Sequence, residues 1–435
     1  MQTIEQLRSG KLSGAHQIKL SCGLTSFPTE LLDLADSLEV LDLSDNKLSS
    51  LPEEFTKLSR LKILFLSGNE FTEFPTVLGE CTNLDIIGFK ANKIARIAEG
   101  SMPSSIRWLI LTNNRFTQLP DSIGKCINLQ KCMLAGNQLT ELPEAMINCK
   151  KLELLRISAN RFERIPEWLF SLPRLAWLAL AGNPMMKNYV QNNLPEISGS
   201  EFEIEQLLGE GASGVISKAR WQKMDKEVAV KVFKGEVTSD GFPEDEMNAC
   251  IAAGFHPNLV RVLGKLKVHP QRKQGLVFDL IEPSFTNLGG PPDFKTCTRD
   301  TFKEGTVFSL QQMLQIASGI ASVLTHLHAR GIVHGDLYAH NILIDDQANP
   351  LLSDFGAAFI FNRNMENFAA LERIEVRAFG CLLDDLLARI DAKDKSFSTT
   401  TMLMKLQEAC MQEIVMLRPD FATIHHQIKN MIDVQ

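Results

Sequence analysis

The chain has 435 residues, and its content of 44% hydrophobic and 22% charged residues is that of a folded rather than a disordered protein. The length predicts two or three domains. A formal net charge of −7 argues against a nucleic-acid partner, and nine cysteines without a Cys-x-x-Cys pair argue against zinc or redox motifs. Residues 1–11 contain no apolar signal segment, and no apolar run reaches the roughly 18 residues that span a membrane. We therefore expect a cytoplasmic protein.

The first part of the chain repeats itself at intervals of 22 or 23 residues. Each unit follows L-x-x-L-x-L-x-x-N-x-L, as in LEVLDLSDNKL, and an imperfect unit precedes the others. This pattern resembles leucine-rich repeats, in which a short strand and a return segment bury their apolar residues only by stacking. We expect the recurrent asparagine to form a buried amide ladder. The sequence predicts a degenerate cap and seven repeats in residues 1–183, beginning at Leu38, Leu61, Leu84, Ile106, Leu129, Leu152 and Leu175.

The concave face of such a solenoid would be unusually apolar. The third position of successive units is apolar in six of seven cases, and contiguous exposed apolar patches usually mark contact surfaces. Concave faces also tolerate scattered apolar residues, so this alternative stays open. We expect the face to bind a protein ligand, a second copy or the second domain of this chain, through Ile63, Phe65, Trp108 and Trp177.

Residues 184–200 are rich in Pro, Asn and Ser-Gly-Ser, and we read them as a linker to a second domain in residues 201–435. That domain opens with the spacing G-x-G-x-x-G at Gly209, Gly211 and Gly214. Dinucleotide-binding folds also carry this spacing, but there it leads into a helix, whereas here Ile216 continues a strand. A second alternating strand, EVAVKVFK, carries Ala229 and Lys231.

These two strands resemble the glycine-rich loop and the third-strand lysine of protein kinases. The resemblance implies that Lys231 neutralises phosphates and is held by a carboxylate of the following helix. Glu246 is the first candidate and Glu244 the second, although acidic residues at a helix start also favour the helix dipole without any other role. The resemblance implies an ATP site that comprises Leu208, Gly209, Glu210, Gly211, Ala212, Ser213, Gly214, Ile216, Ala229, Lys231, the gatekeeper Phe278, Asp279 and Ile281.

Residues 331–356 contain the candidate catalytic and metal-binding residues. Asp336 is followed five residues later by Asn341, and Asp354 opens Asp-Phe-Gly. Phosphoryl transfer needs one carboxylate to orient a hydroxyl, and an amide with a second carboxylate to hold Mg²⁺. The stretch resembles the kinase catalytic loop H-R-D-x-x-x-x-N and D-F-G. By this resemblance Asp336 is the base and Asn341 with Asp354 are the metal ligands, but Gly335 stands where the motif has arginine.

The chain departs from the kinase pattern after Asp354. Residues 354–375 contain no Ser, Thr or Tyr, the A-P-E motif is absent, and Glu375 stands where an aspartate is usual. The resemblance implies a pairing of Arg418 with Glu372. We expect an activity that needs no phosphorylation of this segment, whose apolar residues suit packing instead.

The whole sequence is similar to cytosolic leucine-rich-repeat protein kinases of bacterial or protist type, with an H-G-D catalytic loop. The expected fold class is an α/β leucine-rich-repeat solenoid followed by an α+β two-lobed protein kinase-like domain. The resemblance implies ATP- and Mg²⁺-dependent phosphorylation of protein Ser or Thr. A small-molecule kinase of the H-G-D type and a non-enzymatic scaffold are the alternatives. The apolar concave face would bind a protein ligand or the chain's own kinase domain.

Overall fold

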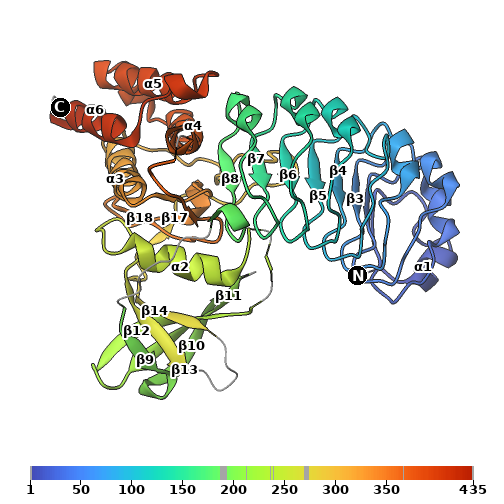
Figure 1. The fold of residues 1–435 in the computed structure, drawn as a ribbon, viewed down its shortest axis with the longest axis horizontal. Coiled ribbons are helices and arrows are strands. Elements are labelled where there is room, and N and C mark those ends of the chain that lie inside the picture. The colour runs from blue at the N-terminus through green and yellow to red at the C-terminus, as the bar shows by residue number, and fades with distance from the viewer. Residues whose placement is uncertain are drawn as a thin grey trace. The chain divides into compact units, whose positions relative to one another are not determined.

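The computed structural model describes residues 2–186, 194–211, 213–235, 237–238, 240–268, 274–365 and 367–433. They form two compact units (Figure 1). The first unit comprises Met1–Leu172 and Asn183–Met185, and the second comprises Pro173–Gly182 and Met186–Gln435. In the described part of the chain, no helix has the length and apolar character that crossing a membrane requires.

The first unit is a stack of short parallel strands behind a five-residue helix, α1 (Ile4–Arg8). Each strand starts at the alternating part of a repeat and buries its central residue completely, as Leu64 and Leu109 illustrate. The strands are β1 (Gln17–Lys19), β2 (Val40–Asp42), β3 (Ile63–Phe65), β4 (Ile86–Gly88), β5 (Trp108–Ile110), β6 (Lys131–Met133) and β7 (Leu154–Arg156). Their register is regular, so that equivalent residues of neighbouring repeats face one another.

Most return segments are 3₁₀ helices, because each begins after a proline and is too short for an α-helix. These helices are η1 (Thr29–Leu34), η2 (Glu53–Lys57), η3 (Thr76–Glu80), η4 (Asp121–Lys125), η5 (Glu144–Asn148) and η6 (Glu167–Ser171). The predicted amide ladder is confirmed. In a typical repeat, the Nδ2 of Asn114 donates to the carbonyls of Phe89 (2.9 Å) and Leu111 (3.0 Å), and its Oδ1 accepts from the amide of Ile94 (3.0 Å).

The second unit contains a six-stranded sheet in the order β10-β11-β12-β14-β13-β9. All neighbours are antiparallel except β13 and β9. Helix α2 (Pro243–Ala253) lies between β12 and β13 in sequence. The strands are β9 (Glu196–Ser198), β10 (Phe202–Glu210), β11 (Gly214–Trp221), β12 (Lys226–Phe233), β13 (Val262–Val268) and β14 (Gly275–Asp279). An apolar cluster that includes Ala219, Val228 and Val277 forms the core of this lobe.

The other lobe of this unit is helical and carries the catalytic-loop region on small strands. Its helices are α3 (Leu310–Ala329), α4 (Phe368–Leu387), α5 (Ser398–Cys410) and α6 (Phe421–Asp433). Its small sheets join β15 (Thr286–Asn287), β17 (Ile342–Ile344) and β18 (Pro350–Leu352), and β16 (Ile332–Val333) with β19 (Phe359–Ile360). Two lobes of this kind confirm the expected fold of the second domain.

The strand of the seventh repeat, β8 (Trp177–Ala179), belongs to the second unit. The sequence placed the domain boundary at residue 183, but Pro173–Gly182 packs with the kinase-like residues. The physical reason is that α4 and the catalytic-loop region bury this segment: Trp177, Ala179 and Leu180 are each at most 1% exposed. The repeat pattern and the compact units therefore end at different residues.

Candidate active site

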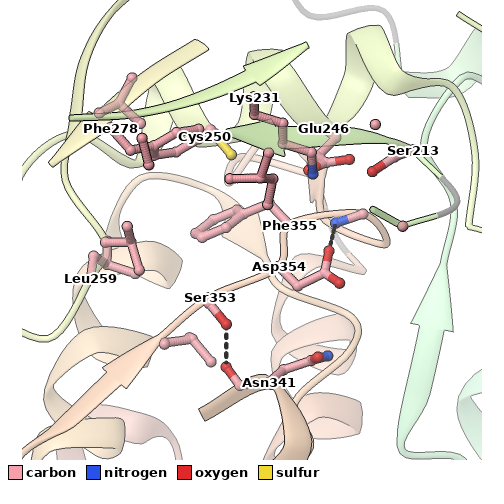
Figure 2. Close-up of a pocket in the computed structure, with 18 of the residues that line it drawn as sticks. Ser213, Lys231, Glu246, Cys250, Leu259, Phe278, Asn341, Ser353, Asp354 and Phe355 are labelled. Atoms are coloured by element: carbon pink, nitrogen blue, oxygen red, sulfur yellow. Dashed lines mark hydrogen bonds and ion pairs between the residues drawn. The ribbon is translucent and has the colours of Figure 1, made fainter. Parts of the chain in front are cut away.

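A cavity of about 430 Å³ opens between the two lobes of the second unit (Figure 2). Its walls come from β11 and β12, α2, the end of β14, the catalytic loop and the segment around Asp354. The volume is within the range of small-molecule sites, which run from about 300 to 1,000 Å³. Among the lining residues are most of the predicted ones: Gly211, Ser213, Gly214, Ile216, Ala229, Lys231, Glu246, Phe278, Asp279, Ile281, Asn341 and Asp354.

The glycine-rich loop is shaped for close backbone approach. The amide of Gly211 donates to the carbonyl of Gly214 (2.9 Å), which closes the loop. A side chain at Gly214 would place its Cβ 2.7 Å from the carbonyl oxygen of Val232, so only glycine fits there. At Gly211, no described atom lies within 4 Å of the place a Cβ would take. The loop therefore leaves room for a group as large as a phosphate, and the residues present fit a nucleotide.

Lys231 and Glu246 form an ion pair at the inner end of the cavity. Lys231 lies on β12 and Glu246 in the first turn of α2, and their side chains are 11% and 3% exposed. Burial works to lower the pKa of Lys231, but the negative charges of Glu246 and Asp354 outweigh it and raise that pKa. Lys231 is therefore a charged group held in place, and Glu244, which is exposed, is not its partner.

The three predicted catalytic and metal-binding residues of the larger lobe lie together. The Nδ2 of Asn341 donates to the backbone carbonyl of Asp336 (3.0 Å) and to its Oδ2 (2.8 Å). Asp354 has a backbone φ of +55°, and its Oδ1 accepts from the amide of Gly356 (3.0 Å). A positive φ is uncommon at a non-glycine residue, although aspartate adopts it more readily than most. The amide of Asn341 and the carboxylate of Asp354, which both line the cavity, are a ligand set that suits Mg²⁺ with phosphates.

The buried carboxylate of Glu375 is hydrogen-bonded to the backbone of the catalytic loop. Glu375 of α4, 1% exposed, accepts from the amide of Gly335 (2.6 Å) and bonds to Nε2 of His328 (2.6 Å). Burial alone would raise the pKa of Glu375, but the hydrogen bond and charge of His328 lower it. The sequence assigned no role to His328, because the contact between its ring and Glu375 joins two helices, α3 and α4, that no sequence pattern brings together.

The segment between β14 and α3 supports the same loop from another direction. Asp300, buried, pairs through Oδ1 with Nδ1 of His340 (2.6 Å) and accepts from the amide of Ala339 through Oδ2. His340 lines the cavity beside Asn341. The sequence assigned this segment no part in positioning the catalytic loop, and the structure places the carboxylate of Asp300 against that loop.

Not every predicted residue lines the cavity. Leu208, Gly209 and Glu210 lie on β10 and are not part of the cavity wall. Asp336 does not line the cavity either, but it is hydrogen-bonded to Asn341, which does. Ala212 falls outside the described residues. Lining residues that the sequence did not single out include Thr238, Asp240, Cys250, Leu259, Leu343 and Leu352. Of these, Leu343 lies two residues after Asn341 and could have been found from that motif. The others reach the cavity only through tertiary packing.

The expected pairing of Arg418 with Glu372 is wrong. Arg418, 1% exposed, donates instead to the carbonyls of Gln412 (2.8 Å), Arg373 (3.0 Å) and Pro173 (2.8 Å). Glu372 lies 3.5 Å from Nδ1 of His328. The guanidinium binds backbone carbonyls, while the carboxylate of Glu372 lies beside His328 of α3 instead.

Comparisons with known proteins agree with this geometry. The model of the protein kinase domain matches residues 202–376, and that of the leucine-rich repeat matches residues 21–71, 104–162 and 127–185. The chain therefore contains leucine-rich repeats followed by a protein kinase domain.

Similar proteins include a probable serine/threonine-protein kinase of Dictyostelium discoideum, 28% identical over 44% of this chain and 11% of its own length. Cyclin-dependent kinase 11.2 of Caenorhabditis elegans is 29% identical over 51% of this chain and 32% of that protein. A putative G-type lectin S-receptor-like serine/threonine-protein kinase of Arabidopsis thaliana is 32% identical over 38% of this chain and 19% of that protein. The chain thus spans less than half the length of these relatives.

Proposed function

We propose that the protein is an ATP- and Mg²⁺-dependent protein kinase that phosphorylates serine or threonine, and that its repeats bind protein. The observation that carries this proposal is the convergence on one cavity of the Lys231–Glu246 pair, Asn341 and Asp354, with Asp336 bonded to Asn341. The kinase domain and the serine/threonine kinases among its relatives support the same class.

The position and charge of each of these residues indicate its role in the proposed reaction. The carboxylate of Asp336 accepts the proton of the substrate hydroxyl, while Asn341 orients that carboxylate. Asn341 and Asp354 would hold the metal ion, which when bound supplies positive charge to the phosphates. Lys231, kept charged by Glu246, neutralises phosphate oxygens, and the apolar walls around Ala229 and Phe278 accommodate the base.

We place the protein in the cytoplasm. All nine cysteines have free thiols, which a reducing compartment preserves. The apolar positions Ile63, Phe65 and Trp108 on the strands of the repeats are only partly buried, so they suit contact with a protein ligand.

An acceptor panel tests the function. Full-length protein is incubated with labelled ATP and Mg²⁺, and offered a Ser/Thr peptide library, its Tyr counterpart, or small alcohols such as aminoglycosides and sugars. We expect label on Ser or Thr. Label that appears only on a small alcohol would favour the small-molecule alternative, and no transfer to any acceptor or to the protein itself would overturn the proposed enzyme.

A further inference from the structure

Residues 173–182 lie within the same compact unit as the catalytic loop, although by sequence they are the seventh leucine-rich repeat. Three groups of contacts join this segment, here called the last-repeat segment, to the machinery described above. They involve the loop's backbone, one of its side chains and two buried arginines.

The first contact is made by Trp177 on β8. Its Nε1 donates to the backbone carbonyl of Leu337 (2.9 Å), the residue after Asp336. Its indole stacks on the ring of Tyr338, with centroids 4.4 Å apart and planes inclined by 4°. Trp177 is 1% exposed and Tyr338 5% exposed, so this stack is a buried part of the structure rather than a surface encounter. One side chain thus restrains the two residues that follow Asp336.

The second contact explains an unusual residue of the catalytic loop. Gly335 precedes Asp336 and has a φ of +72°. A Cβ at this position would lie 2.5 Å from the carbonyl oxygen of Leu178 and 2.8 Å from that of Ala357. No larger side chain fits between these two backbones. The carbonyls of Leu178 and Ala357, together with the positive φ, therefore exclude the arginine that the kinase motif has here, and one of these carbonyls belongs to the last-repeat segment.

The third group anchors the segment. Arg418 donates to the carbonyl of Pro173 (2.8 Å), and Nε of Arg377 donates to that of Arg174 (3.2 Å). Both arginines are buried, and a buried charged donor makes a strong, geometrically demanding hydrogen bond. The segment is therefore held at its start by α4 and the region before α6, and at Trp177 by the catalytic loop.

We propose that the last-repeat segment is a built-in support of the catalytic loop and that Trp177 is a positioning residue for Asp336. The proposal rests on the proposed kinase function. In this arrangement contacts of Trp177 and the Leu178 carbonyl, rather than a pairing of an arginine with a phosphate, hold the catalytic loop, which accords with a segment 354–375 that has no Ser, Thr or Tyr to phosphorylate. A displacement of a catalytic group by about 1 Å can cost a hundredfold in rate, so the support acts on turnover more than on nucleotide binding.

The test compares full-length wild type with Trp177→Ala and Trp177→Phe. The control is Trp168→Ala, because Trp168 lies on η6 of the preceding repeat, does not line the cavity and is not among the residues proposed to bind protein. The assay measures kcat and the KM for ATP with a Ser/Thr peptide, together with the melting temperature. We expect Trp177→Ala to lower kcat at least about tenfold while the KM for ATP stays within about twofold, since Trp177 does not line the cavity.

The phenylalanine variant separates positioning from folding. It retains a ring for the stack on Tyr338 but loses the hydrogen bond to Leu337, so we expect an intermediate kcat and a melting temperature within a few degrees of wild type. If Trp177→Ala does not fold, the comparison of Trp177→Phe with wild type tests the proposal. The proposal would be overturned by a wild-type kcat in Trp177→Ala, by a wild-type kcat in Trp177→Phe where Trp177→Ala does not fold, or by equal losses in Trp177→Ala and Trp168→Ala. An inactive wild type would instead overturn the proposed function, and the positioning role with it.

Discussion

His256, a partly buried histidine outside the cavity, has a hydrogen-bond partner at each ring nitrogen. The amide of Asn258 donates to its Nδ1 (3.1 Å), and its Nε2 bonds to the hydroxyl of Ser322 (3.2 Å). An imidazole that accepts at Nδ1 must be neutral there. Burial, and then the neighbouring His326, His425 and Arg330, lower the pKa of His256 to about 4.

This lowered pKa predicts a loss of stability in acid. Because the unfolded histidine has a pKa near 6.5, the unfolded chain binds the proton first as the pH falls from about 6.5 to about 4. The stability that neutral His256 contributes is complete above that window and is lost across it. Since His256 is partly exposed, we expect about 1 kcal/mol rather than the full value.

The measurement is the melting temperature of wild type and His256→Gln between pH 7.5 and 5. Glutamine can keep one hydrogen bond but does not titrate, so the variant should lose less stability on acidification than wild type. Parallel curves for the two proteins would show that His256 does not contribute to acid sensitivity.

At this scale the sequence predicted the residues whose motifs are local. Asp336 and Asn341 are five residues apart, and Lys231 lies in a recognisable strand, so their contacts follow from spacing. The supports of these residues were missed, because Asp300 and Glu375 reach the catalytic loop from distant segments. No periodicity encodes such contacts.

The segment after Asp354 is the element most altered from the kinase pattern. The expectation that its apolar residues pack is confirmed: Ala357, Ala358, Phe359 and Phe361 are at most 4% exposed, and β19 pairs with β16. An element that is already ordered by burial gains nothing from an added phosphate.

We therefore predict that activity does not depend on phosphorylation of residues 354–375. Phosphatase treatment of active enzyme should leave the rate nearly unchanged, and mass spectrometry should find any phosphate elsewhere. A preparation that is inert until an upstream kinase modifies it would contradict this prediction.

The burial of each residue in the repeats predicts how much its substitution destabilises the protein. Leu109 is the central residue of β5 and is fully buried, so Leu109→Ala should cost about 2–5 kcal/mol in the free energy of unfolding. Ile127 is 58% exposed, and Ile127→Ala should cost well below 1 kcal/mol. Denaturant titration of both variants measures the difference, and equal losses would show that the packing of the repeat is misassigned.

The elements were largely predictable, and their grouping was not. A fixed period with leucines at set positions determines where each strand of the solenoid begins, and the strands β1 to β8 lie where the repeats predict them. The membership of β8 in the second unit depends on contacts of Trp177 and Pro173 with residues more than 150 positions away, which the repeat pattern does not contain.

At the scale of the whole molecule, the last repeat belongs to the same compact unit as the proposed active site. In the proposed function, phosphoryl transfer depends on Asp336. The control is Asp346→Asn, an exposed aspartate ten residues further along the same region.

The most direct measurement is the rate of transfer from labelled ATP to a Ser/Thr peptide by wild type, Asp336→Asn and Asp346→Asn, with melting temperatures recorded alongside. A general base contributes about 10²–10⁴-fold, so Asp336→Asn should be at least about a hundredfold slower with an unchanged melting temperature, while Asp346→Asn should match wild type. Transfer by Asp336→Asn at the wild-type rate would contradict the account.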